Sequence, residues 1–204
     1  MKILIACEYS GIVRDAFIAR GHDAMSCDLL PTESPGPHYQ GDVFNIINDG
    51  WDMMIGFPPC TFITYAGTRH WDNPGRLENR LEALQFFAQL WLAPVDKICL
   101  ENPRGCASPV IAKYSQLINP YYFGDSFSKP TCLWLKKLPL LQHSETDTLF
   151  EQRTHVDKGE FVEFVTNKGT IKKEAKWYRE LGGNSHARSK TFPGIADAMA
   201  EQWG

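Results

Sequence analysis

Apolar runs alternate with amphipathic stretches along the first 120 residues of the chain. Four short apolar runs that end at polar residues predict buried parallel strands. They cover residues 1–7, 22–28, 51–57 and 95–102. The segment 30–41, with three prolines and two glycines, predicts a loop. Strands that alternate with helices predict an α/β fold, in which helices cover a parallel sheet on both faces.

Three stretches carry helical patterns. Residues 11–21 have apolar side chains at helical spacing and stop at Gly21. A longer helix follows a polar loop, and its predicted buried stripe repeats at three- and four-residue steps. This stripe consists of Leu77, Leu81, Leu84, Ala88 and Trp91. Residues 108–118 predict a short helix with Ser108 as N-cap and Pro109 at its first position.

The pattern changes after this alternation. Residues 130–141 predict a strand and its exit loop, and residues 160–173 predict a hairpin of two short strands around an Asn-Lys-Gly turn. Residues 193–203 predict a closing helix. A length of 204 residues suits one domain, 1–204, in which residues 136–183 form a small hairpin-containing insertion.

A cysteine after two prolines gives the sharpest chemical signal. Ligands of open parallel sheets bind beyond the carboxyl ends of the strands, so residues that follow predicted strands are informative. Cys60 follows Pro58 and Pro59 directly after an apolar run. Two prolines fix their φ angles and restrict how the thiol is presented. The alternative is a structural cysteine, because buried free cysteines are common.

Acidic residues also follow predicted strands. Glu101 leaves its strand into Asn102 and a proline, where a carboxylate needs a partner or a function. Asp28 and Asp42 end apparent strands, and Asp28 lies 17 residues past Gly11, which suits a ribose hydroxyl. The alternative for each acid is a local capping or turn residue.

Composition and charge narrow the class of protein. A formal net charge of -3 argues against an overall basic nucleic-acid coat, although it allows a local basic groove. Residues 153–179 hold seven Lys/Arg against four Asp/Glu, which suits either phosphate contacts or a solvated hairpin face. Six single cysteines without a C-x-x-C pair predict neither a metal site nor a disulfide framework. Without a signal-peptide or membrane-span pattern, we expect a cytoplasmic protein with no membrane partner.

These residues occur in the order of a known set of motifs. The chain resembles the cytosine-C5 DNA methyltransferases over roughly its first 135 residues. The resemblance implies a Rossmann-like S-adenosylmethionine-dependent methyltransferase sheet with helices on both faces and a small hairpin appendage. The insertion 136–183 stands in place of the family's large target-recognition domain. In this the chain is similar to compact methyltransferase-like proteins of phage genomes, which implies the cytosol of a bacterium or of a phage-infected host.

The resemblance implies S-adenosyl-L-methionine as the cofactor. In the family, the loop after the first strand holds the methionine part, an acid after the second strand takes the ribose hydroxyls, and a Gly-Asp pair contacts the adenine. A Gly-Asn element near the last helix closes the pocket. The resemblance thereby implies cofactor contacts for Cys7, Glu8, Ser10, Gly11, Asp28, Asp42, Phe57, Pro58 and Asn184.

The resemblance also implies a DNA (cytosine-5-)-methyltransferase activity. Cys60 corresponds to the nucleophile that adds to cytosine C6, and Glu101 to the acid at N3. Lys129 is the best substitute for the family's Gln-Arg-x-Arg element, which is absent. Substrate contacts are implied for Pro59, Asn102 and Thr131.

The substrate has more than one interpretation. DNA with weak sequence readout is the expected partner. A free pyrimidine nucleotide, single-stranded DNA or RNA suits the same fold and chemistry, and the missing recognition domain favours these. A non-catalytic nucleic-acid or nucleotide-binding protein is the alternative from another class. The sequence gives neither the target sequence nor the oligomeric state.

Overall fold

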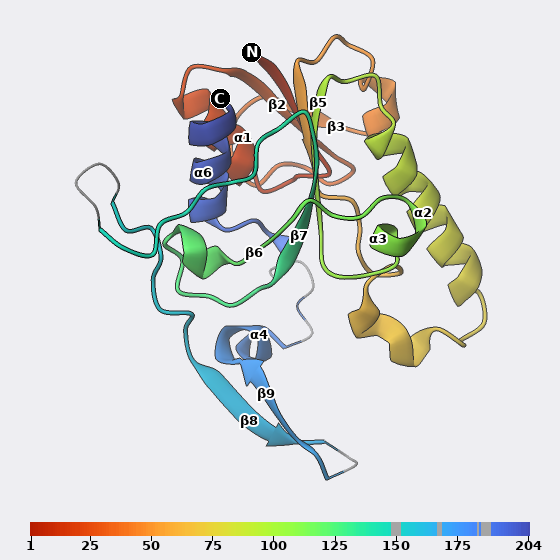
Figure 1. Cartoon of the computed structure of the whole chain (residues 1–204). Helices are drawn as coiled ribbons and strands as arrows, with labels where there is room; N and C mark the ends of the chain where they lie inside the picture. The colour runs from red at the N-terminus through yellow and green to blue at the C-terminus, as the bar shows by residue number, and fades with distance from the viewer. Residues whose placement is uncertain (148–151, 167–168, 183, 185–188) are drawn as a thin grey trace.

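The four apolar runs form adjacent strands at the centre of a seven-stranded sheet (Figure 1). The computed structural model describes residues 1–147, 152–166, 169–182, 184 and 189–204. The strands are β1 (Lys2–Ala6), β2 (Asp23–Asp28), β3 (His38–Gln40), β4 (Met53–Gly56), β5 (Lys97–Asn102), β6 (Gln116–Ile118) and β7 (Thr131–Lys136). Their order is β3-β2-β1-β4-β5-β7-β6, and of these seven strands only β7 runs against the others.

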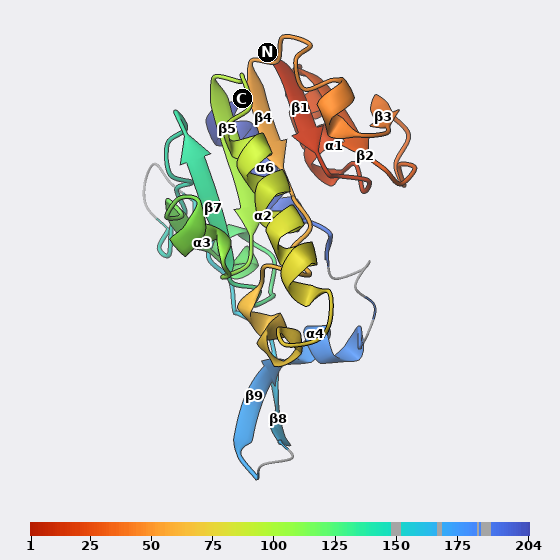
Figure 2. The same cartoon turned by 90° about the vertical axis from the view of Figure 1, so that its right-hand side faces the viewer.

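Helices cover both faces of the sheet, as Figures 1 and 2 show. The helices are α1 (Ile12–Ala19), α2 (Arg76–Trp91), α3 (Ala107–Val110), α4 (Lys176–Glu180) and α6 (Pro193–Trp203). Short 3-10 turns are η1 (Val43–Asn45), η2 (Tyr65–His70) and η3 (Pro120–Phe123). The parallel order β3-β2-β1-β4-β5 is that of a Rossmann sheet. The predicted Rossmann-like α/β fold, with helices on both faces of the sheet, is confirmed.

Two hydrophobic cores follow from the two faces of each strand. On β1, Ile3 and Ile5 pack with α1 and α6, whereas Leu4 and Ala6 belong to the core beneath α2. Side chains alternate between faces along a strand, so one apolar run supplies both cores. This double burial explains why the strands read as continuous apolar runs.

The predicted hairpin is present as a separate two-stranded sheet. It consists of β8 (Phe161–Val165) and β9 (Ile171–Ala175), which pair antiparallel. Residues 167 and 168 of its turn lie outside the described residues. Figure 2 shows the hairpin projecting beyond the carboxyl ends of the sheet strands.

Two predicted segments differ from the structure. The segment 30–41 is not all loop, because β3 pairs with β2 and the Ser26 hydroxyl lies 2.8 Å from His38 Nδ1. Residues 108–118 are not one helix: α3 ends at Val110, Ser108 lies inside it rather than at its N-cap, and β6 pairs with β7. In both cases a partner strand, invisible in local sequence, decides the conformation.

The buried stripe of α2 also differs from the prediction. Leu77 is 55% exposed and Leu81 58% exposed, whereas Leu84, Phe87 and Leu90 are buried. Only the carboxyl-terminal half of the helix packs on the sheet, and its first half extends past the strand ends (Figure 2). The spacing of apolar residues therefore identified the helix, but it did not indicate which half of the helix packs on the sheet.

A pair of substitutions tests this arrangement of α2. Phe87 is fully buried and packs edge-to-face on Trp134 at 5.0 Å, so we expect Phe87→Ala to lower the free energy of unfolding by about 3–5 kcal/mol. Leu81→Ala should change it by less than about 0.5 kcal/mol, because the side chain is exposed. Urea denaturation measures both. Equal losses would contradict the arrangement.

Candidate active site

The residues that leave the central strands lie at one edge of the sheet. Ala6 of β1 is in register with Cys27 of β2 and with Gly56 of β4, and Gly56 with Leu100 of β5. The residues that come next are Cys7, Asp28, Phe57 and Glu101. The register of the parallel strands therefore brings four predicted site residues together.

The loop after β1 is organised around a buried carboxylate. Glu8 is 4% exposed, and its Oε1 accepts hydrogen bonds from Val13 N at 2.7 Å and from the Ser10 hydroxyl at 3.1 Å. It therefore caps the amino terminus of α1, where a negative charge is favourable. Gly11 has φ 78° and precedes the helix. The side chains of Glu8 and Ser10 take part in this cap. The predicted cofactor contacts of these two residues would therefore come from their backbone atoms, and they remain predictions.

A buried arginine beside this loop was missed by the sequence analysis. Arg14 is fully buried, and its guanidinium donates to the Ser26 hydroxyl at 3.1 Å, to the Thr32 hydroxyl at 3.2 Å and to the Ser34 carbonyl at 3.0 Å. Its Nε pairs with Asp15 at 2.8 Å. Arg14 thereby fixes the proline-rich loop after β2. The position of Arg14 on its helix does not indicate this role, because Ser26, Thr32 and Ser34 are distant from it in sequence.

Two acids converge on the end of β1. The pKa of the Cys7 thiol is raised by burial, and then by the nearby charges of Asp28, Cys27 and Asp42. Burial and the same two aspartates raise the pKa of Cys27 to about 12. These thiols are therefore held protonated, and Asp28 and Asp42 lie close to the same point.

Each of these acids uses one carboxylate oxygen locally. Asp28 Oδ1 accepts from Leu30 N at 2.9 Å, and Asp42 Oδ1 accepts from Phe44 N at 3.0 Å as the cap of η1. Among the described residues, no hydrogen bond reaches the second oxygen of either acid. Both acids therefore act as local caps, which was the alternative interpretation of each. The second oxygen of each acid remains available to a polyol.

The Cys60 loop is tied to the end of β5. The Asn102 amide, buried, donates to the Pro58 carbonyl at 2.7 Å. Cys106 N donates to Ile63 O at 2.8 Å, and the loops that follow β4 and β5 form an isolated antiparallel bridge. Cys60 is half-buried, and its carbonyl accepts from Ile63 N, which turns the chain back. Pro59 is exposed on this loop.

Glu101 is positioned by the neighbouring strand. The Thr131 hydroxyl at the start of β7 donates to Glu101 Oε1. Among the described residues, the hydrogen bonds do not include Oε2. Thr131 is buried and Glu101 half-buried. One carboxylate oxygen is therefore fixed, and the other can meet a ligand.

A small recess, with room for about one water molecule, lies against this pair. It is lined by Phe57, Glu101, Pro120, Lys129, Thr131, Thr191, Phe192, Ile195 and Met199. Four of the predicted site residues thus surround one space: Phe57, Glu101, Lys129 and Thr131. The other walls come from Pro120 of η3 and from the final segment of the chain.

That final segment closes over the site. The hydroxyls of Ser189 and Tyr9 lie 2.9 Å apart, and Lys190 pairs with Glu33 at 2.5 Å. Lys129 donates to the Lys190 carbonyl at 3.3 Å. The segment therefore joins the β1 loop to the start of β7, with Lys129 as the cation between them.

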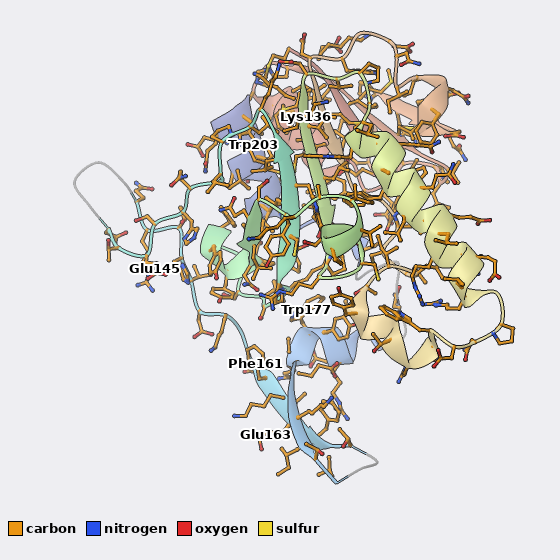
Figure 3. The ribbon with its side chains drawn as sticks, turned by 45° about the vertical axis from the view of Figure 1, so that its right-hand side comes forward. Lys136, Glu145, Phe161, Glu163, Trp177 and Trp203 are labelled. Atoms are coloured by element: carbon orange, nitrogen blue, oxygen red, sulfur yellow. The ribbon has the colours of Figure 1, made fainter. Side chains whose placement is uncertain are left out.

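The hairpin is anchored beside the recess by aromatic side chains. Trp177 of α4 lies 5.8 Å from the Phe127 ring and 5.6 Å from the Phe192 ring, and its indole donates to Ser128 O at 3.3 Å. Figure 3 shows Trp177 at the foot of the hairpin, with Phe161 and Glu163 farther out. Asn184 is exposed after α4, where its backbone N–H donates to Leu181; its contact to a cofactor remains a prediction.

Two of the seven basic residues of 153–179 form ion pairs among the described residues. Lys173 lies 3.1 Å from Glu163, and Lys176 lies 2.6 Å from Glu160. These exposed pairs support a solvated hairpin face more than a surface dedicated to phosphates. In the described part of the chain, we find no cluster of acidic, histidine or cysteine side chains suited to a metal ion. No described helix has the length and apolar content to span a membrane.

Comparisons with known proteins were made with the whole chain. No protein-family profile and no curated protein sequence matches it. Among solved structures it is similar to a mutant of DNMT2 from Spodoptera frugiperda, with a TM-score of 0.42 and 18% identity. The similarity covers 76% of this chain and 56% of that chain, so it spans little more than half of that protein's length.

The buried Glu8 cap predicts a pH effect. Burial raises the pKa of Glu8 in the folded chain, against the opposing hydrogen bonds from Val13, Ser10 and Arg14. The folded state then binds the proton more tightly, so stability falls as pH rises from about 4.3 through the raised pKa. We expect Glu8→Gln to flatten this fall in urea denaturation, and exposed Glu82→Gln to keep it. An unchanged slope in Glu8→Gln would refute the assignment.

The clamp between the two loops gives a second prediction. Asn102→Ala leaves the Pro58 carbonyl buried without its donor, so we expect a loss of about 1–3 kcal/mol in the free energy of unfolding. Hydrogen exchange should rise at Ile63 N and Thr64 N in the Cys60 turn more than at β1 amides. A loss of stability without faster exchange in that turn would place the effect elsewhere.

Proposed function

We propose that this chain is an S-adenosylmethionine-dependent methyltransferase that acts at C5 of cytosine in DNA through a covalent Cys60 adduct. The observation that carries the proposal is the Asn102–Pro58 clamp. It fixes the Pro-Pro-Cys loop to the strand end that bears Glu101. A nucleophile and an acid on two independent loops would lack this fixed relation, which catalysis by positioning requires.

Cys60 and Glu101 would act on different atoms of the pyrimidine ring. The Cys60 thiolate forms a bond to C6, and the electron pair of the 5,6 double bond moves toward C5 and N3. Glu101, held at Oε1 by Thr131, would use Oε2 to hold a proton at N3. C5 would then bond to the methyl group as the bond from that methyl to the donor sulfur breaks, leaving a neutral thioether. A base would remove the proton at C5, and the Cys60 sulfur would leave as the 5,6 double bond re-forms. Lys129 would supply positive charge beside Glu101.

Four features would hold the cofactor. Asp28 and Asp42 each offer a free carboxylate oxygen to hydroxyl or amino groups. Phe57 lies at the adjoining strand end, and Gly11 allows the turn that starts α1. When bound, S-adenosyl-L-methionine supplies the methyl group on its sulfonium. The inward side chains of Glu8 and Ser10 would leave this contact to the loop backbone.

A smaller or single-stranded substrate is the second candidate for the same chemistry. The ion pairs of Lys173 and Lys176 reduce the number of hairpin cations that can track two phosphate backbones. Single-stranded DNA, RNA or a pyrimidine nucleotide also avoids the cost of extracting a base from a duplex. Steep loss of affinity with salt would favour a strand, whereas a shallow loss would favour a mononucleotide.

A binding protein without catalysis is the third candidate. The inward-facing Glu8 and Ser10 favour it, because they remove polar side chains from the first loop. Calorimetric titration with S-adenosyl-L-methionine separates it from the enzyme proposals. No binding at millimolar ligand would exclude both of them.

The deciding experiment measures transfer of a labelled methyl group to duplex DNA, single-stranded DNA, RNA and deoxycytidine nucleotides. We expect label at pyrimidine C5 with at least one substrate, and a loss of at least about 10⁴-fold in Cys60→Ser. Cys106→Ser is the matched control, because Cys106 precedes α3 at a position where serine is a suitable cap. It should retain transfer.

Two outcomes would overturn the proposal. Full transfer by Cys60→Ser would remove Cys60 as the nucleophile. Absence of transfer to all four substrates, by folded protein that binds cofactor, would leave a binding function.

A further inference from the structure

Two arginines of α2 turn toward the Cys60 loop. Arg76 Nη2 donates to the Thr61 carbonyl at 2.7 Å, and its guanidinium lies over the Phe62 ring at 4.4 Å. Arg80, one turn later, lies over the Trp71 ring at 4.0 Å. Both side chains therefore face the segment that follows Cys60, in the half of α2 that extends past the sheet (Figure 2).

Several donors in this group are buried without a partner. Arg80 Nε and Nη2, Arg76 Nε and Trp71 Nε1 have no hydrogen bond in the described part of the chain. Buried polar groups are nearly always paired, and leaving one unpaired is costly, more so for a charged group. Four such donors in one place indicate that an acceptor belongs there.

The charge of the group is also uncompensated. Among the described residues, no ion pair joins Arg76 or Arg80 to a carboxylate. Glu78 and Glu82 on the same helix are exposed and leave both guanidiniums unpaired. Like charges four residues apart on a helix repel each other. An anion between the two arginines would relieve both the repulsion and the missing acceptors.

The geometry favours a phosphate over a base. The rings of Phe62 and Trp71 are already covered by guanidinium groups, so they are not free to stack on a base. Stacking on an aromatic face holds a guanidinium in plane, and its N–H fork suits the tetrahedral oxygens of phosphate. The unpaired donors are covered by protein atoms, so an oxyanion reaches them only when side chains of the segment after Cys60 move aside.

We propose that Arg76 and Arg80 bind a phosphate group of the substrate, next to the nucleotide whose base meets Cys60. The contact from Arg76 to Thr61 places this site one residue from Cys60. The phosphate is a diester of a strand or the monoester of a nucleotide. Its placement on the substrate rests on the proposed function, whereas the anion site itself rests on the unpaired donors.

Equilibrium binding without cofactor tests the site. The probes are a short fluorescent single-stranded oligonucleotide with one cytosine, the same strand with uncharged methylphosphonates flanking that cytosine, deoxycytidine monophosphate and deoxycytidine. We expect Arg80→Ala and Arg76→Ala each to weaken binding of the charged strand by about 10-fold. Each should also lower the salt slope by about 1.

The uncharged strand provides the internal control. Wild type should bind it at least about 10-fold more weakly, and Arg80→Ala should distinguish the two strands less than wild type does. Arg20→Ala is the matched control, since Arg20 pairs with Asp197 and Glu201 past the end of α1. It should behave as wild type. If wild type does not distinguish the charged strand from the uncharged one, nor the monophosphate from deoxycytidine, the phosphate site is excluded.

Thermal unfolding separates ligand binding from a structural function. Arg80→Met keeps the bulk of the side chain but removes the unpaired charged donors, so its Tm without ligand should equal or exceed that of wild type. A clear fall in Tm would mean that Arg80 serves the fold, and would overturn the proposal.

Failure of the two proposals is distinguishable. Phosphate-dependent binding without methyl transfer would keep the anion site and reject the enzyme. Methyl transfer, together with binding that the arginine substitutions do not affect, would keep the enzyme and reject the anion site. Preference for the strand over deoxycytidine monophosphate identifies the diester, and the opposite preference identifies the monoester.

Discussion

The hydrogen bond from the Asn102 amide to the Pro58 carbonyl joins the loops that leave two neighbouring strands, and backbone hydrogen bonds farther along both loops reinforce it. Parallel register brings the ends of β4 and β5 to the same edge, but it does not set the path of the chain beyond that edge. The amide helps to set this path, because the buried Pro58 carbonyl needs a hydrogen-bond donor. This junction relates the proposed nucleophile on one loop to the strand end that bears the proposed acid, and Arg76 contacts the same loop at Thr61.

The sequence predicted which segments form helices and strands better than it predicted which of their residues are buried. The apolar runs of β1, β4 and β5 and the closing helix α6 were found because local periodicity reflects burial on a face. β3 was missed because its three residues form a strand only through pairing with β2. Leu77 and Leu81 were placed in the core because helical spacing records an apolar side but not where the sheet beneath it stops.

For the candidate site, too, the sequence predicted some residues and missed others. Ordered motifs selected Phe57, Glu101, Lys129 and Thr131, which line one recess. The capping bonds of Glu8 could not be foreseen, since a carboxylate after a strand suits a ligand or a helix terminus equally well. Arg14, Arg76 and Arg80 gave no signal at all, because an arginine within a helical pattern usually belongs to a solvated face.

The hairpin begins and ends at one point of the protein. Lys176 N donates to the Glu160 carbonyl at 2.8 Å, and the same two residues form an ion pair, so the chain enters and leaves through a single junction. A segment with adjacent ends can change length at little entropic cost, because loop-closure entropy grows only slowly with loop size. Residues 160–176 therefore have the architecture of an exchangeable module. A longer or shorter segment between these two residues would leave every strand of the central sheet unaltered.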